Sequence, residues 1–138
     1  MQELSRRRRA RELTLQVLFQ KEFVSDIDSA ASLDYFRNQL DVPGESLAFA
    51  QQLLEGIEKY KSEIDQKIAN ASRNWKISRM SSVDLNILRM GVFELVYTQN
   101  ETPAHVIIDE AVEIAKRYGN TDSHAFVNGI LDEIHKSR

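Results

Sequence analysis

The segment Leu85–Tyr97, LNILRMGVFELVY, is the most apolar part of this chain and limits its possible folds more than any other feature. Its charged or amide side chains are Asn86, Arg89 and Glu94. At 100° per residue these three fall on one narrow stripe with Tyr97, so every other face of such a helix must meet protein. The pattern therefore predicts a helix at the centre of the fold. A segment of this length is also too short to cross a bilayer.

The rest of the chain also shows helical spacing. No run alternates with period two between turn residues, and only 2 prolines and 5 glycines interrupt the sequence. We therefore predict an all-α protein of six or seven helices joined by short loops. Apart from the central helix, the predicted helices cover about 6–23, about 29–40, one helix or two from Ser46 through Ile68, Pro103–Tyr118, and a last helix with its core at Val127, Ile130, Leu131 and Ile134.

Polar residues and glycines mark the expected helix ends. Ser81 with Asp84 three residues later resembles a capping box before the central helix. Ser46 and Thr102 are the expected caps at the starts of two further helices, and Pro103 takes the first helical position after Thr102. Gly119, in a left-handed conformation, is expected to end its helix, and Thr121 or Asp122 is expected to cap the last one.

Gly56, Gly91 and Gly129 lie inside helical patterns. Glycine in a helix interior costs about 1 kcal/mol relative to alanine. We expect each of the three to allow the close approach of another helix.

The length and the cysteine count limit the class of protein. A chain of 138 residues fits one domain with a substantial hydrophobic core. The absence of cysteine excludes disulfides, thiolate metal sites and cysteine nucleophiles, and it agrees with a reducing compartment. No stretch has the pattern of an export signal, so we expect the protein to be cytoplasmic.

Positive charge is concentrated near the N-terminus, in the stretch SRRRRARE of residues 5–12. The net charge is −3, but without the arginines at positions 6, 7, 8, 9 and 11 the chain has 13 basic against 21 acidic residues. Cations at the start of a helix are repelled by the positive end of its dipole, so this cluster needs an external reason. The asymmetry indicates contact with a polyanion at one end of an acidic body.

Three motifs in this chain resemble the NusB family of transcription antitermination factors. They are RRRARELTLQVLF near the start, WKISRMSSVDLNILRMGVFEL in the middle and PAHVIIDEAVEIAKRYGNTDSHAFVNGILD near the end. The match is collinear over nearly the whole chain. The last motif is the most specific, whereas residues 24–80 resemble the family mainly in pattern.

The resemblance implies an all-helical fold of two small bundles packed at an angle, covering about 1–75 and 76–138. It also implies a role without catalysis, because members bind the single-stranded boxA element of nascent RNA together with NusE, the ribosomal protein S-ten. They help RNA polymerase, as part of an antitermination complex, to read through terminators in ribosomal RNA operons. No cofactor, metal, membrane or small-molecule substrate is expected.

The resemblance assigns RNA binding to two groups of residues and NusE binding to two more. The RNA-binding groups are the basic element Arg7, Arg8, Arg9 and Arg11, and the loop and helix start at Asn120, Asp122, Ser123 and Phe126. The NusE-binding residues are Phe19 and Asp84, where relatives often have tyrosine and glutamate.

The residue types suit these roles. Arginine presents a charge and a planar donor fork to phosphates, and Arg11 shares a helix face with Arg7 or Arg8. Asp122 can accept hydrogen bonds from base edges, and Phe126 can stack on a base if its ring is exposed.

Plainer structural interpretations stay open for the same residues. Arg7, Arg8, Arg9 and Arg11 also fit a frayed, solubilising tail. Phe19 and Phe126 also fit positions in the core, and Asp84 and Asp122 also fit the starts of helices. Trp75 stands beside Ile77 and Met80 at a helix junction, where burial in the core is favoured over a role in stacking.

Enzyme functions are not favoured by the sequence. Neighbours on a helix point 100° apart, so Asp122, Ser123 and His124 cannot align as a catalytic triad. No glycine-rich phosphate loop is present. His105 with Asp109, and Asp132 with His135, could each offer two ligands to a metal ion. Neither pair has a matching partner that would supply the remaining ligands.

Three other functions compete with the favoured one. One is the RNA-binding module that precedes a ribosomal RNA methyltransferase domain, but the chain ends at Arg138 without room for a nucleotide-cofactor fold. Another is a helix-turn-helix DNA binder with residues 121–136 as its recognition helix, whose acidic charge does not suit a major groove. A helical scaffold for protein interactions is the third.

Overall fold

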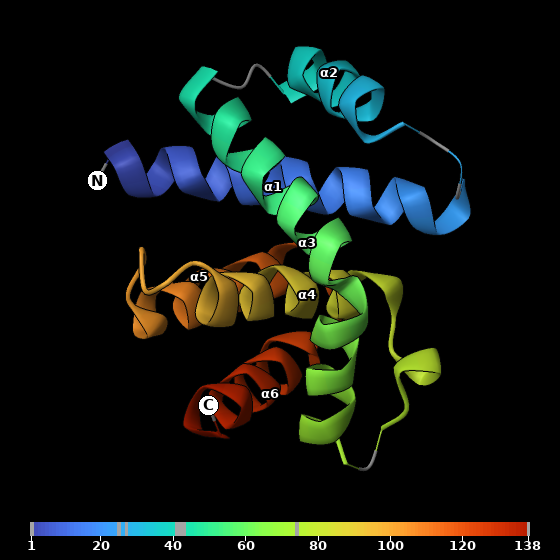
Figure 1. Cartoon of the computed structure of the whole chain (residues 1–138), viewed down its shortest axis with the longest axis vertical. Coiled ribbons are helices and arrows are strands. Elements are labelled where there is room, and N and C mark those ends of the chain that lie inside the picture. Colours follow the sequence, from blue (N-terminus) through green and yellow to red (C-terminus); the bar gives the residue numbers. More distant parts are fainter. Residues whose placement is uncertain (1, 25, 27, 41–43, 74, 138) are drawn as a thin grey trace. The chain divides into compact units, whose positions relative to one another are not determined.

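The computed structural model describes residues 2–24, 26, 28–40, 44–73 and 75–137 (Figure 1). These residues form six α-helices and one short 3-10 helix, with no strand among them, which confirms the all-α prediction. The elements are α1 (Gln2–Phe23), α2 (Ser29–Leu40), α3 (Gly44–Ala71), the 3-10 helix η1 (Ile77–Arg79), α4 (Ser82–Tyr97), α5 (Ala104–Tyr118) and α6 (Ser123–Ser137). None of the helices described here is long and apolar enough to span a membrane.

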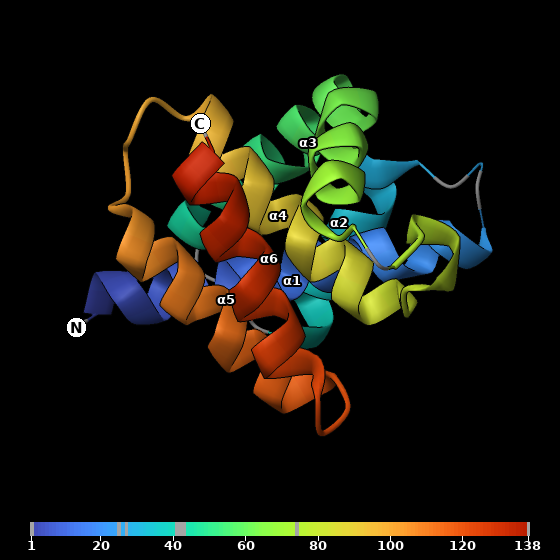
Figure 2. The same ribbon diagram turned by 90° about the horizontal axis from the view of Figure 1, so that it is seen from below.

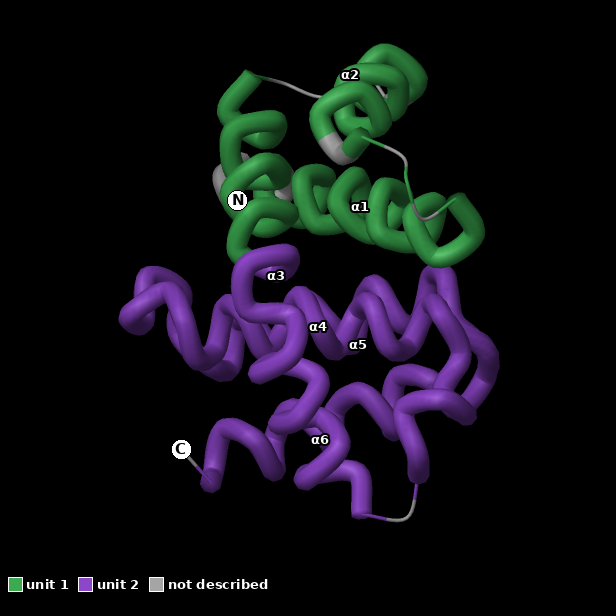
Figure 3. Tube along the Cα trace, turned by 45° about the vertical axis from the view of Figure 1, so that its right-hand side comes forward, with its two compact units in different colours: residues 1–56 green, residues 57–138 purple. Residues whose placement is uncertain are grey.

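The chain divides into two compact units, residues 1–56 and residues 57–138 (Figure 3). Unit 1 holds α1, α2 and the first part of α3. Unit 2 holds the rest of α3 together with η1, α4, α5 and α6. The boundary between the units lies inside α3, whereas the division expected from the sequence motifs lies near residue 75, after that helix. The motif-based division stays a prediction.

Unit 1 is built on the packing of α2 against α1. The hydroxyl of Ser32 in α2 donates a hydrogen bond to the side-chain oxygen of Gln20 in α1. Apolar side chains that are spaced at helical intervals are buried in all three segments, among them Leu13, Val17, Leu33, Ala50 and Leu53. Burial of each large apolar side chain contributes roughly 1.5–3 kcal/mol, so this spacing supplies the main stabilisation of the unit.

Two helix starts in unit 1 differ from the prediction. α1 begins at Gln2 rather than near Arg6. α3 begins at Gly44, so Ser46 lies inside the helix and is not its cap. The hydroxyl of Ser46 instead donates to the backbone carbonyl of Arg6 at 2.8 Å, and it thereby links α3 to α1. A serine near a helix start can satisfy a distant backbone group as well as its own helix, and spacing along the chain does not distinguish the two cases.

α4 is the central helix of unit 2, as the sequence predicts. It packs against both α5 and α6, which also pack against each other (Figures 1 and 2). Every residue from Asp84 to Leu95 is buried, including the polar stripe. The stripe is therefore enclosed by protein like the other faces.

Arg89 explains how a polar stripe is accommodated inside unit 2. Its Nε and Nη2 donate to the two carboxylate oxygens of Asp65 in α3, at 2.8 Å and 3.0 Å. Its Nη1 donates to Oδ1 of Asn86 at 3.0 Å. A two-point bond of this kind compensates the cost of burying a guanidinium group and joins the end of α3 to α4.

The apolar pattern of residues 46–68 lies on one helix, α3, which has a kink, so the first of the two alternatives left open by the sequence is the correct one. Tyr60 has non-helical backbone angles, φ −107° and ψ 16°. Its ring stacks on Tyr97 of α4, with 4.3 Å between the ring centres and 13° between the planes. The kink therefore coincides with a second contact between α3 and α4.

The helix ends of unit 2 confirm one prediction and correct two. Ser81 caps α4, and its hydroxyl accepts a hydrogen bond from the backbone N–H of Asp84 at 3.1 Å. α5 begins at Ala104 with Pro103 as its cap, so Thr102 is not the cap residue. Gly119 has φ −92° and ψ −172°, which is extended rather than left-handed. A Cβ at this position would overlap the side chain of Ser123, so close approach is what favours glycine there.

The glycines inside α4 and α6 play different roles. A Cβ on Gly91 would lie 2.7 Å from Cδ1 of Leu131 in α6, so this glycine permits close contact between α4 and α6, as predicted. A Cβ on Gly129 would meet nothing within 4 Å, and the residue is exposed. The prediction of close packing at Gly129 is wrong.

Candidate functional site

The N-terminal arginine cluster, defined as Arg6, Arg7, Arg8, Arg9 and Arg11, lies within α1. Because α1 begins at Gln2, these residues occupy its second and third turns rather than its first. The helix dipole acts mainly within the first turn, so the repulsion expected from the sequence is smaller than predicted. The concentration of positive charge on this part of α1 remains.

Phe49 of α3 orders the inner side of the cluster. The guanidinium carbon of Arg7 lies 4.4 Å from the centre of the Phe49 ring, and that of Arg11 lies 5.3 Å from it. Arg7 and Arg11 therefore share a face of α1, as the spacing predicts. Arg11 is only 3 % exposed, so its contact with Phe49 is an interior one.

The outer side of the cluster is more accessible. Arg6 and Arg9 are exposed, and Arg8 is half-buried. Nη1 of Arg6 donates to the Glu45 carboxylate at 2.7 Å, in a pair whose two side chains are both well exposed. Such a surface pair contributes at most about 1 kcal/mol and can exchange for another anion.

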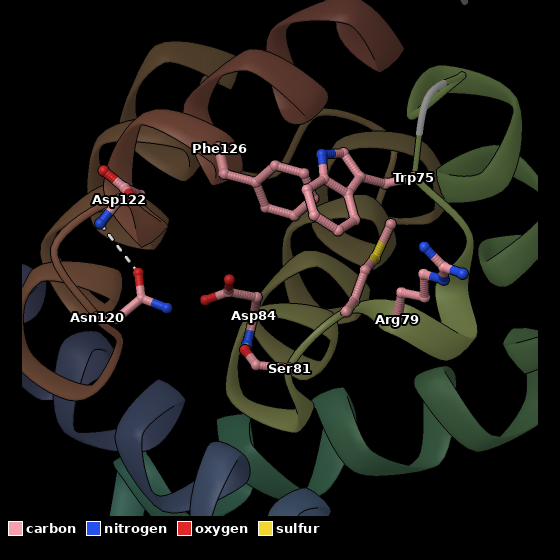
Figure 4. A pocket seen from close by; sticks show the side chains of 8 residues that line it. Trp75, Arg79, Ser81, Asp84, Asn120, Asp122 and Phe126 are labelled. Carbon is pink, nitrogen blue, oxygen red and sulfur yellow. Dashed lines mark hydrogen bonds between the residues drawn. The ribbon is translucent and has the colours of Figure 1, made fainter.

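Unit 2 contains a pocket of about 380 Å³, which we call the Asp84 pocket (Figure 4). Three segments supply its lining: the turn and η1 before α4, the start of α4, and the loop and first turn of α6. The lining residues are Trp75, Arg79, Met80, Ser81, Asp84, Asn120, Asp122 and Phe126. Four of these residues were predicted from the sequence, and the fold brings them together from segments far apart in the chain: Asp84, Asn120, Asp122 and Phe126.

Asn120 fixes the loop before α6. Its side-chain oxygen accepts hydrogen bonds from the backbone N–H of Asp122 at 2.9 Å and from the hydroxyl of Ser123 at 3.3 Å. The Ser123 hydroxyl in turn accepts from the backbone N–H of Asn120 at 3.0 Å. Ser123 is buried and holds the loop together, whereas the Asp122 side chain is exposed.

Trp75 lies in the Asp84 pocket and is not a core residue. The residue is 53 % exposed, and its ring meets the half-buried ring of Phe126 edge to face, with 6.4 Å between centres and 79° between planes. The prediction of a buried tryptophan is therefore wrong. Its neighbours Ile77 and Met80 suggested a core, but η1 has no buried residue, so the segment lies on the surface.

Asp84 and Phe19, the predicted partner-binding residues, differ in accessibility. Asp84 is only 7 % exposed, and its Oδ1 has no hydrogen-bond partner among the described residues. Its carboxylate points into the pocket (Figure 4). Phe19 is 37 % exposed and contacts the ring of Phe23, which is more exposed still, with 5.0 Å between centres. Phe19 therefore belongs to an apolar surface at the end of α1.

Chemically, the two regions are suited to binding rather than to acid–base work. The hydroxyl of Ser123 bonds with Asn120, so it is not arranged as a nucleophile beside His124. Within the described ranges, no three His, Asp or Glu side chains gather into a group that could hold a metal ion. Charged donors on α1 and a pocket with two aromatic rings and two acids offer sites for phosphates and for a planar polar group.

Comparison with known proteins identifies the family. The model of the NusB family matches residues 8–136. The transcription antitermination protein NusB of Bdellovibrio bacteriovorus is 44 % identical over 134 residues, which cover 97 % of this chain and 98 % of that protein.

Solved structures agree with this match. T. maritima NusB has a TM-score of 0.87 and 39 % identity, over 96 % of this chain and 92 % of that one. A crystal structure of the antitermination factors NusB and NusE in complex with dsRNA has a TM-score of 0.87, over 97 % of this chain and 98 % of that one. At 23 % identity, the second likeness concerns the fold alone. The family model and the full-length relative together establish that this chain belongs to the NusB family.

Proposed function

We propose that this chain is an antitermination factor that binds the boxA element of nascent RNA together with NusE, the ribosomal protein S-ten. It thereby promotes processive transcription of ribosomal RNA operons in the cytoplasm, as part of the RNA polymerase antitermination complex. The observation that carries the proposal is the N-terminal arginine cluster on a chain that is otherwise strongly acidic. Single-stranded RNA is the polyanion that its relatives' role in transcription suggests.

In this proposal, the arginines have two kinds of role. Arg8 and Arg9 reach RNA phosphates directly, with Arg7 at the edge of the contact. Arg11 is buried against Phe49, so it supports Arg7 by holding the same aromatic face. Each phosphate that is neutralised releases counterions, which gives affinity that falls as salt rises.

The loop before α6 supplies contacts to bases. Asn120 and Asp122 carry polar groups on a loop that internal hydrogen bonds hold in place, and Phe126 offers a half-buried ring. Fixed polar groups beside an aromatic ring suit recognition of unstacked bases. Ser123 is buried, so its proposed part is to shape the loop.

NusE binding is proposed for Asp84 at the start of α4 and for the apolar surface at the end of α1. Phe19, Phe23 and Val24 are all exposed there. Aromatic residues in such a patch are typical anchors of protein interfaces. A related NusB was solved together with NusE and RNA, which supports the choice of partner.

The experiment is a titration of labelled boxA RNA by fluorescence anisotropy, with and without NusE. We expect boxA RNA to bind more tightly than a scrambled RNA of the same composition, and NusE to strengthen the binding. Phe19→Ala should reduce the effect of NusE about tenfold and leave binding of RNA alone within twofold, because it removes an interface anchor only.

Tyr35→Ala is the matched control, because Tyr35 is an exposed aromatic residue on α2 outside the proposed surface. It should change neither measurement. Equal binding of boxA and scrambled RNA in the presence of NusE would refute the proposed function. An unchanged effect of NusE in Phe19→Ala would refute the proposed partner surface alone.

A further inference from the structure

We propose that Glu45 is an internal competitor of RNA: its carboxylate occupies the Arg6 guanidinium in the free chain and must leave before Arg6 can bind an RNA phosphate. The inference rests on the proposed RNA-binding function and adds to it two residues that the family resemblance did not assign to RNA. The observations that carry it are the ion pair of Arg6 with Glu45, the contacts that hold the start of α3 against the N-terminal arginine cluster, and the exposure of both charges.

One face of α3 meets the N-terminal arginine cluster. Glu45 and Phe49 are four residues apart on α3, so they lie on the same face of that helix. Nη1 of Arg6 donates to the Glu45 carboxylate at 2.7 Å, and the Phe49 ring contacts the guanidinium groups of Arg7 and Arg11. The acid and the ring therefore both belong to the surface of α3 that the cluster contacts.

Ser46 holds Glu45 at this place. The Ser46 side chain is buried, and its hydroxyl donates to the backbone carbonyl of Arg6 at 2.8 Å. This bond joins the residue after Glu45 to the residue whose side chain Glu45 binds. The carboxylate is therefore kept close to the guanidinium, and closeness within one chain gives a weak binding group a high effective concentration.

The ion pair is suited to exchange with phosphate. The side chains of Arg6 and Glu45 are 44 % and 77 % exposed, so water reaches both charges. Pairs that are exposed in this way contribute little to folding, and their loss costs the chain little. The planar donor fork of arginine binds carboxylate and phosphate oxygens in the same geometry. A phosphate of an RNA strand can therefore replace the carboxylate.

Arg6 lies beside the residues that are proposed to bind RNA phosphates. Arg6 and Arg9 are three residues apart on α1 and both are exposed, so they are neighbours on the surface of that helix. A strand that binds Arg9 thus brings further phosphates close to Arg6. The Glu45 carboxylate opposes this approach, because it neutralises Arg6 and repels the phosphates. It should therefore lower the affinity of the chain for RNA.

The first test removes the charge of the competitor. Glu45→Gln keeps the size of the side chain, and the probe is the labelled boxA RNA, titrated by anisotropy at several salt concentrations. We expect about fivefold tighter binding. The slope of log affinity against log salt should become steeper by up to about 0.7, because one more cation binds a phosphate. A gain of affinity cannot result from partial unfolding of the variant.

The second test asks whether the gain passes through Arg6, and it combines the two changes in a double-mutant cycle. Arg6→Ala should weaken RNA binding about twofold in the wild-type chain, where Glu45 already holds the guanidinium. In the Glu45→Gln chain it should weaken binding about tenfold. Glu45→Gln should consequently give no gain of affinity in a chain that lacks the Arg6 side chain.

Glu55→Gln is the matched control. Glu55 is an exposed acid on the same helix, ten residues or roughly 15 Å further along it than Glu45. The change removes the same charge from the chain but not from the contact with Arg6. Its effect on RNA affinity should stay within twofold.

The outcomes separate this proposal from the proposed function. If Glu45→Gln leaves RNA affinity within twofold or weakens it, the competitor is refuted. If Glu45→Gln strengthens binding equally with and without the Arg6 side chain, Glu45 repels RNA without occupying Arg6, and the proposal is also refuted. In both cases the proposed function stands as long as Arg8→Ala with Arg9→Ala weakens RNA binding. If that double variant binds RNA like the wild type, the proposed function fails, and the competitor fails with it.

Discussion

Arg89 shows what the sequence indicates about a single residue and what it leaves out. Its place on a polar stripe with Asn86 follows from helical spacing, and the two side chains are indeed hydrogen-bonded to each other. Its main partner, Asp65, lies 24 residues earlier in α3. Nothing in local spacing selects that residue, because the contact depends on how α3 packs against α4.

We expect Asp65→Ala to lower the free energy of unfolding by about 3 kcal/mol, because it removes the carboxylate that accepts hydrogen bonds from Nε and Nη2 of the buried Arg89 guanidinium. The measurement is urea unfolding followed by circular dichroism. Asp34→Ala is the control, since Asp34 pairs with Arg37 at 3.1 Å in a largely exposed position and should contribute less than about 1 kcal/mol. Equal effects of the two changes would contradict this assignment.

The candidate site was only partly predictable at the level of residues. Asp122, Asn120 and Phe126 were identified by their motif, and the structure places all three in one pocket. The sequence did not identify Trp75 as a pocket residue, because an aromatic residue beside apolar neighbours looks the same in sequence whether it is buried or exposed. It did not identify Arg79 either, because the place of Arg79 in the pocket depends on packing between distant segments. Arg11 was grouped with the other arginines, although only the structure reveals its burial against Phe49.

At the level of elements, the presence of the helices was predictable, but several of the residues at which they begin or end were not. The spacing of apolar residues determines which face of a helix is buried, and this spacing extends over many residues. A helix end depends on one or two residues whose side chains can serve other purposes, as Ser46 does when it bonds to α1. The cap at Ser81 was predicted correctly because its partner, the N–H of Asp84, is local.

The contact between α4 and α6 gives a prediction at this scale. We expect Gly91→Ala to lower the free energy of unfolding by about 1–3 kcal/mol, because the added methyl group would collide with the fully buried side chain of Leu131. Gly129→Ala on α6 should instead raise it by up to about 1 kcal/mol, because the site is open and alanine favours the helix. The check is urea unfolding of both variants, and a stabilising Gly91→Ala would contradict the close packing.

For the whole molecule, the sequence predicted an all-α fold with a central apolar helix, and the structure confirms both. Family membership also confirms the expectation that the protein is not an enzyme. The meeting of the segments around residues 75–84 and 120–126 in one pocket was not predictable, because it depends on packing between helices that are distant in the chain.

The distribution of charge is the property of the whole molecule on which the proposed function depends. Five arginines stand close together on α1, whereas acidic residues outnumber basic ones in the rest of the chain. Acidic regions repel the phosphates of an RNA strand, so the electrostatic attraction to the RNA backbone should come mainly from the cluster. Binding should then depend steeply on salt through a small number of residues.

The most direct measurement is the salt dependence of boxA RNA binding by the wild-type chain and by a variant with Arg8→Ala and Arg9→Ala. Each lost phosphate contact should make the slope of log affinity against log salt shallower by about 0.7, so we expect a change of about 1.4, together with weaker binding. A control with Arg37→Ala and Arg117→Ala removes the same charge from two other helices and should keep the wild-type slope. If the two double variants have the same slope, the N-terminal arginine cluster does not bind the RNA backbone and the proposed function loses its basis.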